Sequence, residues 1–165
     1  MSTGQDNANA YLRTQVMSAT PAELRMMLLD GAVKFAKQGR QGLVDKDHEQ
    51  VYSGFSQARA IITELMTSMR PEAAPELCEQ VRSLYAFLFQ ELVRASMDSD
   101  LPRADKAIEL LEYEQQTWRL LLEQLKTEEG AGNAPAQPAQ QSVPGRTAGY
   151  GAPAQDNYTP LSVEG

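Results

Sequence analysis

Apolar residues recur at three- and four-residue spacing in four segments of this chain, which is typical of amphipathic helices. Turn-forming residues separate the segments, and Gly39 is expected to end the first of them. In chain order, the expected helices run from Pro21 to about Gln38, from Asp45 or Asp47 to just before Pro71, from about Pro75 past Ala95, and from Asp100 to about Lys126.

The order of these segments predicts the fold class. No segment alternates apolar and polar residues with period two, so no sheet is expected. The connections are short, within the two to eight residues usual between helices of a bundle, which makes consecutive helices antiparallel neighbours. We therefore predict an all-α, antiparallel up-down four-helix bundle, with a short N-terminal helical segment and a disordered C-terminal tail.

The first long helix has a strong N-terminal signal and an unusually wide apolar arc. Thr20 is a suitable N-cap, Pro21 fits the first helical position, and Glu23 completes a capping box. Apolar side chains then cover about 260° of the helix, interrupted by Arg25, although a bundle helix needs a stripe only somewhat wider than 100°. The residues of this arc are Leu24, Met26, Met27, Leu28, Leu29, Ala32, Val33, Phe35 and Ala36. The surplus predicts a surface that binds another protein.

Composition divides the chain into three parts. Residues 1–10 are polar and are expected to be a disordered lead-in, and residues 11–126 form the helical-bundle domain. Residues 127–165 are rich in Ala, Gly, Pro and Gln, so they bury too little apolar area to offset chain entropy and are expected to be disordered. This low-complexity tail is either solubilising or carries a short docking motif at Tyr158–Leu161.

Charge and cysteine content limit the possible partners and compartment. The net charge of -7 and pI near 4.8 disfavour nucleic-acid binding. No apolar run is long enough to cross a membrane, and the N-terminus lacks the features of a secretory signal. The single cysteine, Cys78, excludes an internal disulfide and fits a reducing compartment. A cytosolic protein is expected.

Residues suited to catalysis or metal binding are scarce. The chain has one histidine, His48, which cannot supply a di-iron or zinc site by itself. Histidine phosphotransfer domains place Lys and Gly at the third and fourth positions after their histidine, whereas this chain has Val51 and Tyr52. No glycine-rich phosphate loop or nucleophile elbow is present. We expect no catalytic residue, no metal and no cofactor, and keep phosphotransfer as a minor alternative.

Several motifs stand out over roughly residues 11–125. They are Tyr11 to Val16, Ser18 to Leu24, Met27 to Phe35, Ala58 to Leu65, Leu84-Tyr85 through Leu92 to Ala95, and Trp118. Together these motifs resemble the flagellar export chaperone family FliS. Two departures are conservative: Leu29 replaces a usual tyrosine, and the hydroxyl residues of Ser18-Ala19-Thr20 are in a different order.

The resemblance implies a cytosolic chaperone that holds the disordered C-terminal segment of flagellin, blocks premature polymerisation and passes the subunit to the type III export apparatus. An export-gate component and a second copy of the chain are further candidate partners. The expected client-binding residues are Tyr11, Leu12, Val16, Leu24, Met27, Leu28, Gly31, Ala32 and Phe35.

Three questions stay open from the sequence. The missing side chain of Gly31 lets either a neighbouring helix or the client approach closely. The patch of Tyr11, Leu12 and Val16 either covers the binding groove in the absence of client or anchors the start of the first long helix. The alternative function is a helical scaffold that uses the surplus apolar face for its own dimerisation.

Overall fold

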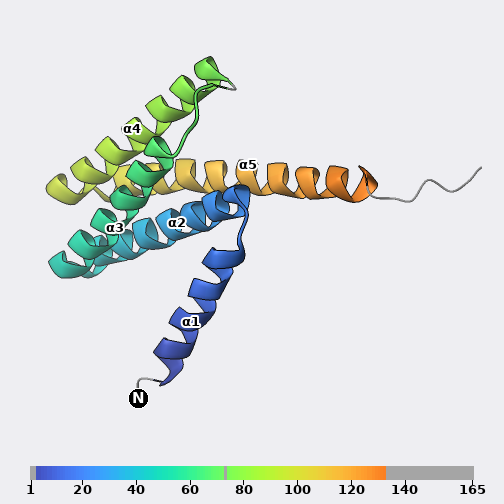
Figure 1. Ribbon diagram of the computed structural model, residues 1–165. Helices are drawn as coiled ribbons and strands as arrows, with labels where there is room; N and C mark the ends of the chain where they lie inside the picture. Colours follow the sequence, from blue (N-terminus) through green and yellow to red (C-terminus); the bar gives the residue numbers. More distant parts are fainter. Residues whose placement is uncertain (1–2, 73, 133–165) are drawn as a thin grey trace, which may run out of the picture. The chain divides into compact units, whose positions relative to one another are not determined.

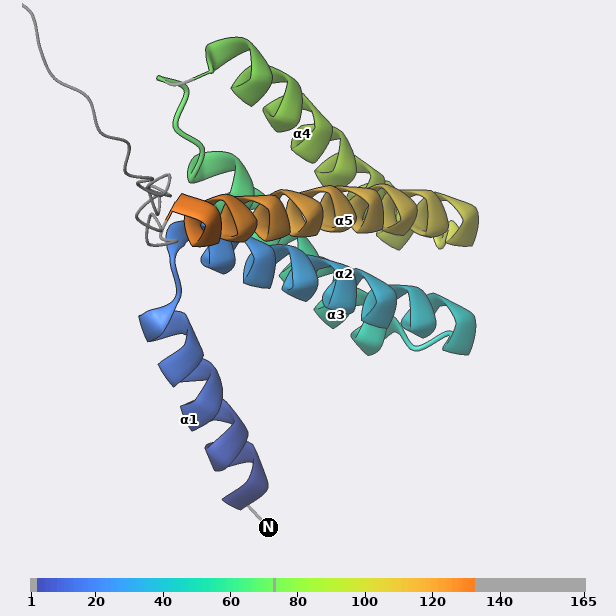
Figure 2. The same cartoon turned by 90° about the vertical axis from the view of Figure 1, so that its right-hand side faces the viewer.

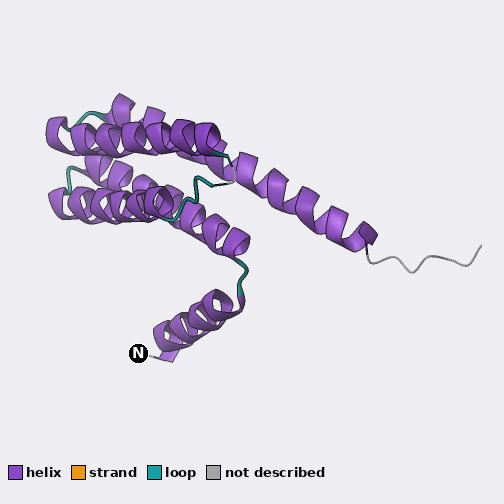
Figure 3. Cartoon of the chain, turned by 45° about the horizontal axis from the view of Figure 1, so that its top comes forward, coloured by secondary structure: helices purple, strands orange, loops and turns teal. Residues whose placement is uncertain are grey.

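The computed structural model describes residues 3–72 and 74–132, and these ranges form five α-helices without a strand (Figures 1 and 3). The predicted tail lies outside the described residues from position 133 onward. The helices are α1 (Thr3–Ser18), α2 (Pro21–Asp45), α3 (His48–Thr67), α4 (Pro75–Asp98) and α5 (Leu101–Gly132).

Helices α2 to α5 form an antiparallel bundle, which confirms the predicted fold class. Each helix runs opposite to the one before it (Figure 1). Helix α2 packs against α3 and α5, and α4 packs against the same two helices. Figure 2 shows α2 and α4 on opposite sides of α5. Within the described ranges, no helix is long and apolar enough to cross a bilayer.

The core is made of aliphatic and aromatic side chains from all four bundle helices. Helix α2 contributes four of them, fewer than half of its apolar arc. The buried hydrophobic residues are Leu29, Ala32, Val33, Ala36, Val51, Phe55, Ala58, Ile62, Leu65, Tyr85, Leu88, Leu92, Ala95, Ala104, Ala107, Ile108 and Leu111.

Helix α2 continues past Gly39, so the predicted stop at this residue is wrong. Gly39 lies where the Phe55 ring packs against α2, because a Cβ built on Gly39 would be 2.5 Å from Phe55 Cδ1. Gly54 on α3 is similarly close, since its Cβ would be 2.2 Å from the Gly39 nitrogen. The helix ends instead at Asp45, followed by Lys46 in the left-handed region with φ 57°. These glycines therefore serve close helix packing and not termination.

Two aspartates cap the following helices. The Asp47 carboxylate accepts a 3.0 Å hydrogen bond from the Gln50 backbone N–H at the start of α3. The Asp100 carboxylate accepts one of 3.0 Å from the Arg103 N–H at the start of α5. Of the two candidate caps for α3, Asp47 is the one used, and the predicted start of the last helix at Asp100 is confirmed.

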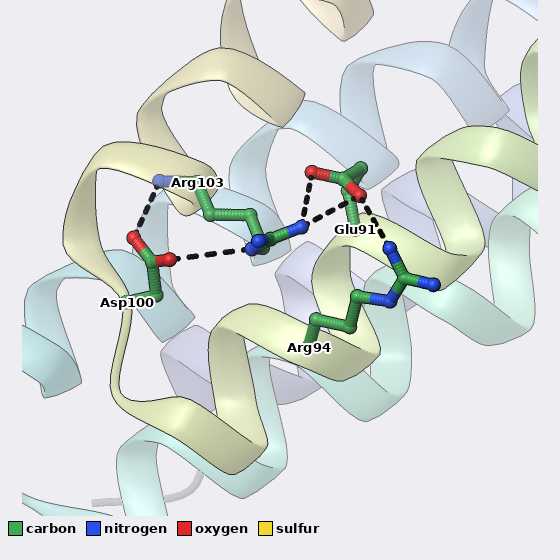
Figure 4. Close-up of polar contacts among 4 residues, drawn as sticks. All are labelled: Glu91, Arg94, Asp100 and Arg103. Atoms are coloured by element: carbon green, nitrogen blue, oxygen red, sulfur yellow. Dashed lines mark hydrogen bonds and ion pairs between the residues drawn. The ribbon is translucent and has the colours of Figure 1, made fainter.

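A buried carboxylate joins α4 to the start of α5. Glu91 is only 7% exposed, and Arg103 Nη1 donates to both of its oxygens at 3.0 and 3.1 Å (Figure 4). The same guanidinium donates through Nε to Asp100 at 3.2 Å, and Arg94 lies 3.7 Å from Glu91. Arg103 thus links the turn residue Asp100 to Glu91, a buried residue of α4. This cluster therefore fixes the turn between the two helices.

Both ends of the described chain are more helical than predicted. Residues 3–10, expected to be a disordered lead-in, belong to α1, whose side chains from Gly4 to Ser18 are exposed. Helix α5 extends to Gly132, beyond the predicted end near Lys126. Local bonds support this extension, because Thr127 Oγ1 donates to the Glu123 carbonyl at 2.9 Å and Gln124 bonds Glu128 at 3.1 Å.

Candidate functional site

The N-terminus of α2 carries the complete capping box expected from the sequence. The Glu23 N–H donates to Thr20 Oγ1 at 3.2 Å, and the Thr20 N–H donates to Glu23 Oε2 at 3.0 Å. The pKa of Glu23 lies below its ordinary value of 4.5. The main cause is the hydrogen bond that its carboxylate accepts from the Thr20 backbone, and the next is the hydrogen bond from Lys126. Lys126 on α5 lies 3.1 Å from this carboxylate. The helix therefore begins at a defined residue next to α5.

Beyond its four core residues, α2 presents apolar side chains that are only partly buried. Four of them lie on one side of the helix, at about 100° per residue, together with Gly31; we call these five residues the α2 stripe. The α2 stripe consists of Leu24, Met27, Leu28, Gly31 and Phe35, all of intermediate exposure. Ala32, which the sequence analysis included among the client-binding residues, is fully buried in the core and does not reach this surface.

One edge of the α2 stripe is in contact with α3. A Cβ built on Gly31 would be 3.1 Å from Ile61 Cδ1, so the missing side chain makes room for the neighbouring helix. Leu28, Phe35 and Ile61 are half-buried and pack against the core. Of the two interpretations of Gly31, the structure therefore supports close approach of a bundle helix.

A hollow of about 560 Å³ opens beside the N-terminal part of the α2 stripe. We call it the Trp118 pocket. Helices α2, α3 and α5 and the residues after α3 contribute to it, and most of its α2 residues are apolar. The lining residues are Pro21, Ala22, Leu24, Arg25, Leu28, Glu64, Ser68, Arg70 and Trp118.

Trp118 and Arg25 form the inner wall of this pocket. Trp118 Nε1 donates a 3.0 Å hydrogen bond to the Ala22 carbonyl, which fixes the indole against α2. The Arg25 guanidinium lies 5.1 Å from the Trp118 ring centroid and 5.7 Å from that of Tyr85, within the range of cation–π contacts. Both aromatic rings therefore hold the guanidinium at the pocket.

A hydrogen-bond chain connects Arg25 to α5. Arg25 Nη2 donates to the Tyr85 hydroxyl at 3.2 Å, and this hydroxyl donates to Glu114 Oε1 at 2.9 Å. Burial, and then the negative charge of Glu114, raise the pKa of Tyr85 well above its ordinary value, so the phenol stays protonated and can donate. In the sequence, Arg25 was evident only as an interruption of the apolar arc, and Tyr85 only as part of a motif of the family resemblance.

A second hollow, of about 380 Å³, lies on the other side of Met27. Methionine side chains adapt well to irregular partners. Met26 and Met27 line this hollow together with the end of α1 and part of α5; the other lining residues are Gln15, Ser18, Ala19, Glu23, Asp30, Leu122 and Lys126. The α2 stripe therefore lies between two hollows.

The predicted patch on α1 is exposed and does not cover the α2 stripe. Tyr11 is 70% exposed, Leu12 52% and Val16 42%. Met17, which the sequence analysis passed over, is exposed beside them. In this structure the patch thus neither covers a groove nor anchors the start of α2; it is available for contact with another molecule.

Neither the single histidine nor the single cysteine lines one of these two hollows. His48 is exposed at the first position of α3. Cys78 is partly buried, and its thiol donates to the Arg70 carbonyl at 3.3 Å. Within residues 3–72 and 74–132, no group of His, Cys, Asp and Glu could hold a metal ion.

Comparison with known proteins gives a consistent result. A family model described as "Flagellar protein FliS" matches residues 4–125. The flagellar secretion chaperone FliS of Bacillus subtilis (strain 168) is 30% identical over 96 residues, covering 58% of this chain and 71% of that protein. Its counterpart in Escherichia coli (strain K12) is 28% identical over 118 residues, covering 70% of this chain and 85% of that protein. The flagellar secretion chaperone FliS of Campylobacter jejuni is 25% identical over 111 residues, covering 67% of this chain and 87% of that protein.

Proposed function

Because the chain belongs to the FliS family, a family of chaperones and not of enzymes, we propose that it binds the C-terminal segment of flagellin in the cytosol. The complex keeps flagellin from polymerising before export and delivers it to the flagellar type III apparatus, where an export-gate component receives it. The similarity to three relatives, all flagellar secretion chaperones, supports a role in export.

The partly exposed apolar surface of α2 is the observation that carries this proposal. Leu29, Ala32, Val33 and Ala36 are the hydrophobic residues of α2 that are buried in the core, and the α2 stripe remains partly open to solvent. A disordered client that becomes helical must overcome about 2–5 kcal/mol of ordering cost, which burial of apolar area offsets. An apolar helix face laid against such a stripe is a common way to recognise a peptide.

The α1 patch gives the client a second contact in this proposal. Tyr11, Leu12 and Val16 are exposed on a helix joined to α2 by two residues. A solitary helix of this length is only marginally stable in water, so α1 gains stability by packing against a bound client. The client then lies between α1 and the α2 stripe, and Met26 and Met27 adapt to its side chains.

Titration calorimetry of the full-length chain with the C-terminal segment of flagellin from the same organism tests the proposal. We expect the double substitution Leu24→Gln and Leu28→Gln to weaken binding at least about tenfold, which corresponds to about 1.4 kcal/mol. Leu120→Gln is the matched control, because Leu120 is an exposed leucine of α5 that lines neither hollow. Equal affinities of all three proteins would place the site elsewhere, and no binding by the unmodified chain would overturn the proposal.

Self-association is the second candidate function, and the exposed apolar patch of α1 favours it. A dimer formed through this patch would bury it without any client. A concentration series by light scattering, with and without the flagellin segment, distinguishes the two functions. A chaperone is expected to form a complex with the segment at concentrations where the free chain does not dimerise.

A further inference from the structure

We propose that the Trp118 pocket recognises an apolar side chain of the client together with a neighbouring carboxylate, which pairs with Arg25 and Arg70. This inference rests on the proposed function and specifies the chemistry of the segment that the site selects. The pocket would then distinguish an apolar, acidic segment from one that is only apolar.

The apolar part of the pocket sets the first requirement. Leu24 and Leu28 belong to the α2 stripe, so the pocket is continuous with the proposed client surface. The Trp118 indole is fixed by its hydrogen bond to the Ala22 carbonyl and forms a rigid wall. A volume of about 560 Å³ accommodates one large apolar side chain and the atoms around it. A rigid aromatic wall beside aliphatic side chains favours such a residue.

The charge around the pocket sets the second requirement. The whole chain has a net charge of -7, but the pocket lining contains two arginines and one carboxylate, Glu64. The lining is thus locally positive in an acidic protein. A client carboxylate at this point is attracted by the two arginines, whereas elsewhere the excess negative charge repels it.

Arg25 has unused hydrogen-bonding capacity. A guanidinium carries five N–H donors, and within the described residues the side chain of Arg25 makes one hydrogen bond, to the neutral Tyr85 hydroxyl. No described carboxylate lies within ion-pair distance of it. The two aromatic rings and the Tyr85–Glu114 bond already hold the group in place. A held guanidinium loses little side-chain entropy when a carboxylate binds to it.

Arg70 supplies a second positive charge, and substituting it disturbs the bundle less than substituting Arg25. Its side chain is exposed at the rim and makes no hydrogen bond or ion pair in the described part of the chain. Substituting Arg70 therefore removes charge from the pocket without removing a contact of the bundle. Arg25 is less suitable by itself, because its contacts with Tyr85 and Trp118 also stabilise the packing of α2.

The test measures how tightly two forms of the flagellin C-terminal segment bind to the full-length chain. One is natural, and in the other every Asp and Glu is replaced by Asn and Gln. We expect the unmodified chain to bind the natural segment at least about fivefold more tightly, and Arg70→Gln and Arg25→Gln each to reduce this preference to less than about twofold. Raising the salt concentration should reduce the preference as well. The single tryptophan, Trp118, gives a fluorescence signal of pocket occupation.

Arg82→Gln is the matched control, since Arg82 is an exposed arginine of α4 that does not line the pocket. It should keep the full preference for the natural segment. Circular dichroism checks that each variant is folded, and Arg70→Gln decides the question if Arg25→Gln is not. Equal binding of both segments, or a preference that survives Arg70→Gln, would overturn this inference and leave the proposed function intact. Absence of any binding would overturn both.

Discussion

At the scale of single residues, Gly54 has the shortest distance between a built Cβ and a neighbouring atom among the described glycines, and that neighbour is Gly39. A Cβ on Gly54 would be 2.2 Å from the backbone nitrogen and 2.6 Å from the Cα of Gly39. Both of these atoms belong to the backbone of α2, which cannot move away as a flexible side chain would. The contact between α2 and α3 therefore depends on the absence of a side chain at this position.

We predict that Gly54→Ala destabilises the protein by more than about 3 kcal/mol, because the methyl group forces two helix backbones apart. Gly130→Ala is the control, since nothing lies within 4 Å of a Cβ on this helical residue of α5. Replacing glycine by alanine in an open helix should stabilise it by up to about 1 kcal/mol. Urea denaturation measures the free energy of unfolding of both variants, and equal values would contradict the close packing at Gly54.

The Glu91 cluster gives a second prediction at this scale. Arg103→Ala leaves a buried carboxylate without its bidentate partner and should cost about 2–3 kcal/mol, at the lower end for buried pairs because Arg103 is itself partly exposed. Arg94→Ala removes a mostly exposed arginine 3.7 Å from the same carboxylate and should cost less than about 1 kcal/mol. Thermal unfolding compares the two; similar losses would show that Arg103 does not hold Glu91.

At the scale of elements, the start of α2 depends on an ionised carboxylate. Glu23 accepts hydrogen bonds from the N–H and the hydroxyl of Thr20 and pairs with Lys126 of α5. The same residue thus caps its own helix and connects it to α5. Glu23 and Lys126 both line the hollow of about 380 Å³ beside Met27, so this connection fixes one border of the α2 stripe.

We predict a pH-dependent contribution from this cap. The pKa of Glu23 is lowered in the folded state, so its stabilising effect is present above the ordinary value of 4.5 and is lost as the pH falls through the folded value. Glu23→Gln removes the charge at every pH. Denaturation midpoints measured from pH 7 to about pH 2 should therefore differ most at pH 7 and converge in acid. A constant difference would mean that the charge has no role.

At the scale of the whole molecule, the proposed binding surface is left partly open because the helices are longer than the core that they share. Along α4 and α5 the core residues are followed, toward the N-terminus of α4 and the C-terminus of α5, by exposed leucines such as Leu77 and Leu125. Figures 1 and 2 show the first half of α4 diverging from α5. The Trp118 pocket lies toward this end, where the four helices no longer cover one another.

We predict that ending the chain after Lys126 leaves folding intact. The family match ends at residue 125, the last fully buried core residue is Leu111, and Lys126 is kept to pair with Glu23. The melting temperature should change by less than about 3 °C, since about 1 kcal/mol corresponds to a few degrees in a domain of this size. Calorimetric unfolding of both forms measures the change; a larger loss would show that residues 127–165 contribute to the fold.

The sequence by itself determined the helical fold, the capping box, the start of the last helix at Asp100, and the excess of apolar residues on α2, because these depend on local spacing and local hydrogen bonds. It left the cap of α3 open between Asp45 and Asp47, and the structure shows that Asp47 is used. Only the tertiary structure decided which part of the apolar arc is buried. In the structure Ala32 lies in the core, and Gly39 packs against α3 where the sequence had indicated the end of a helix. Arg25, Tyr85 and Glu114 come together from three helices. The reason is that burial depends on the neighbouring helix, and the identity of that neighbour at each position is not a local property of the chain.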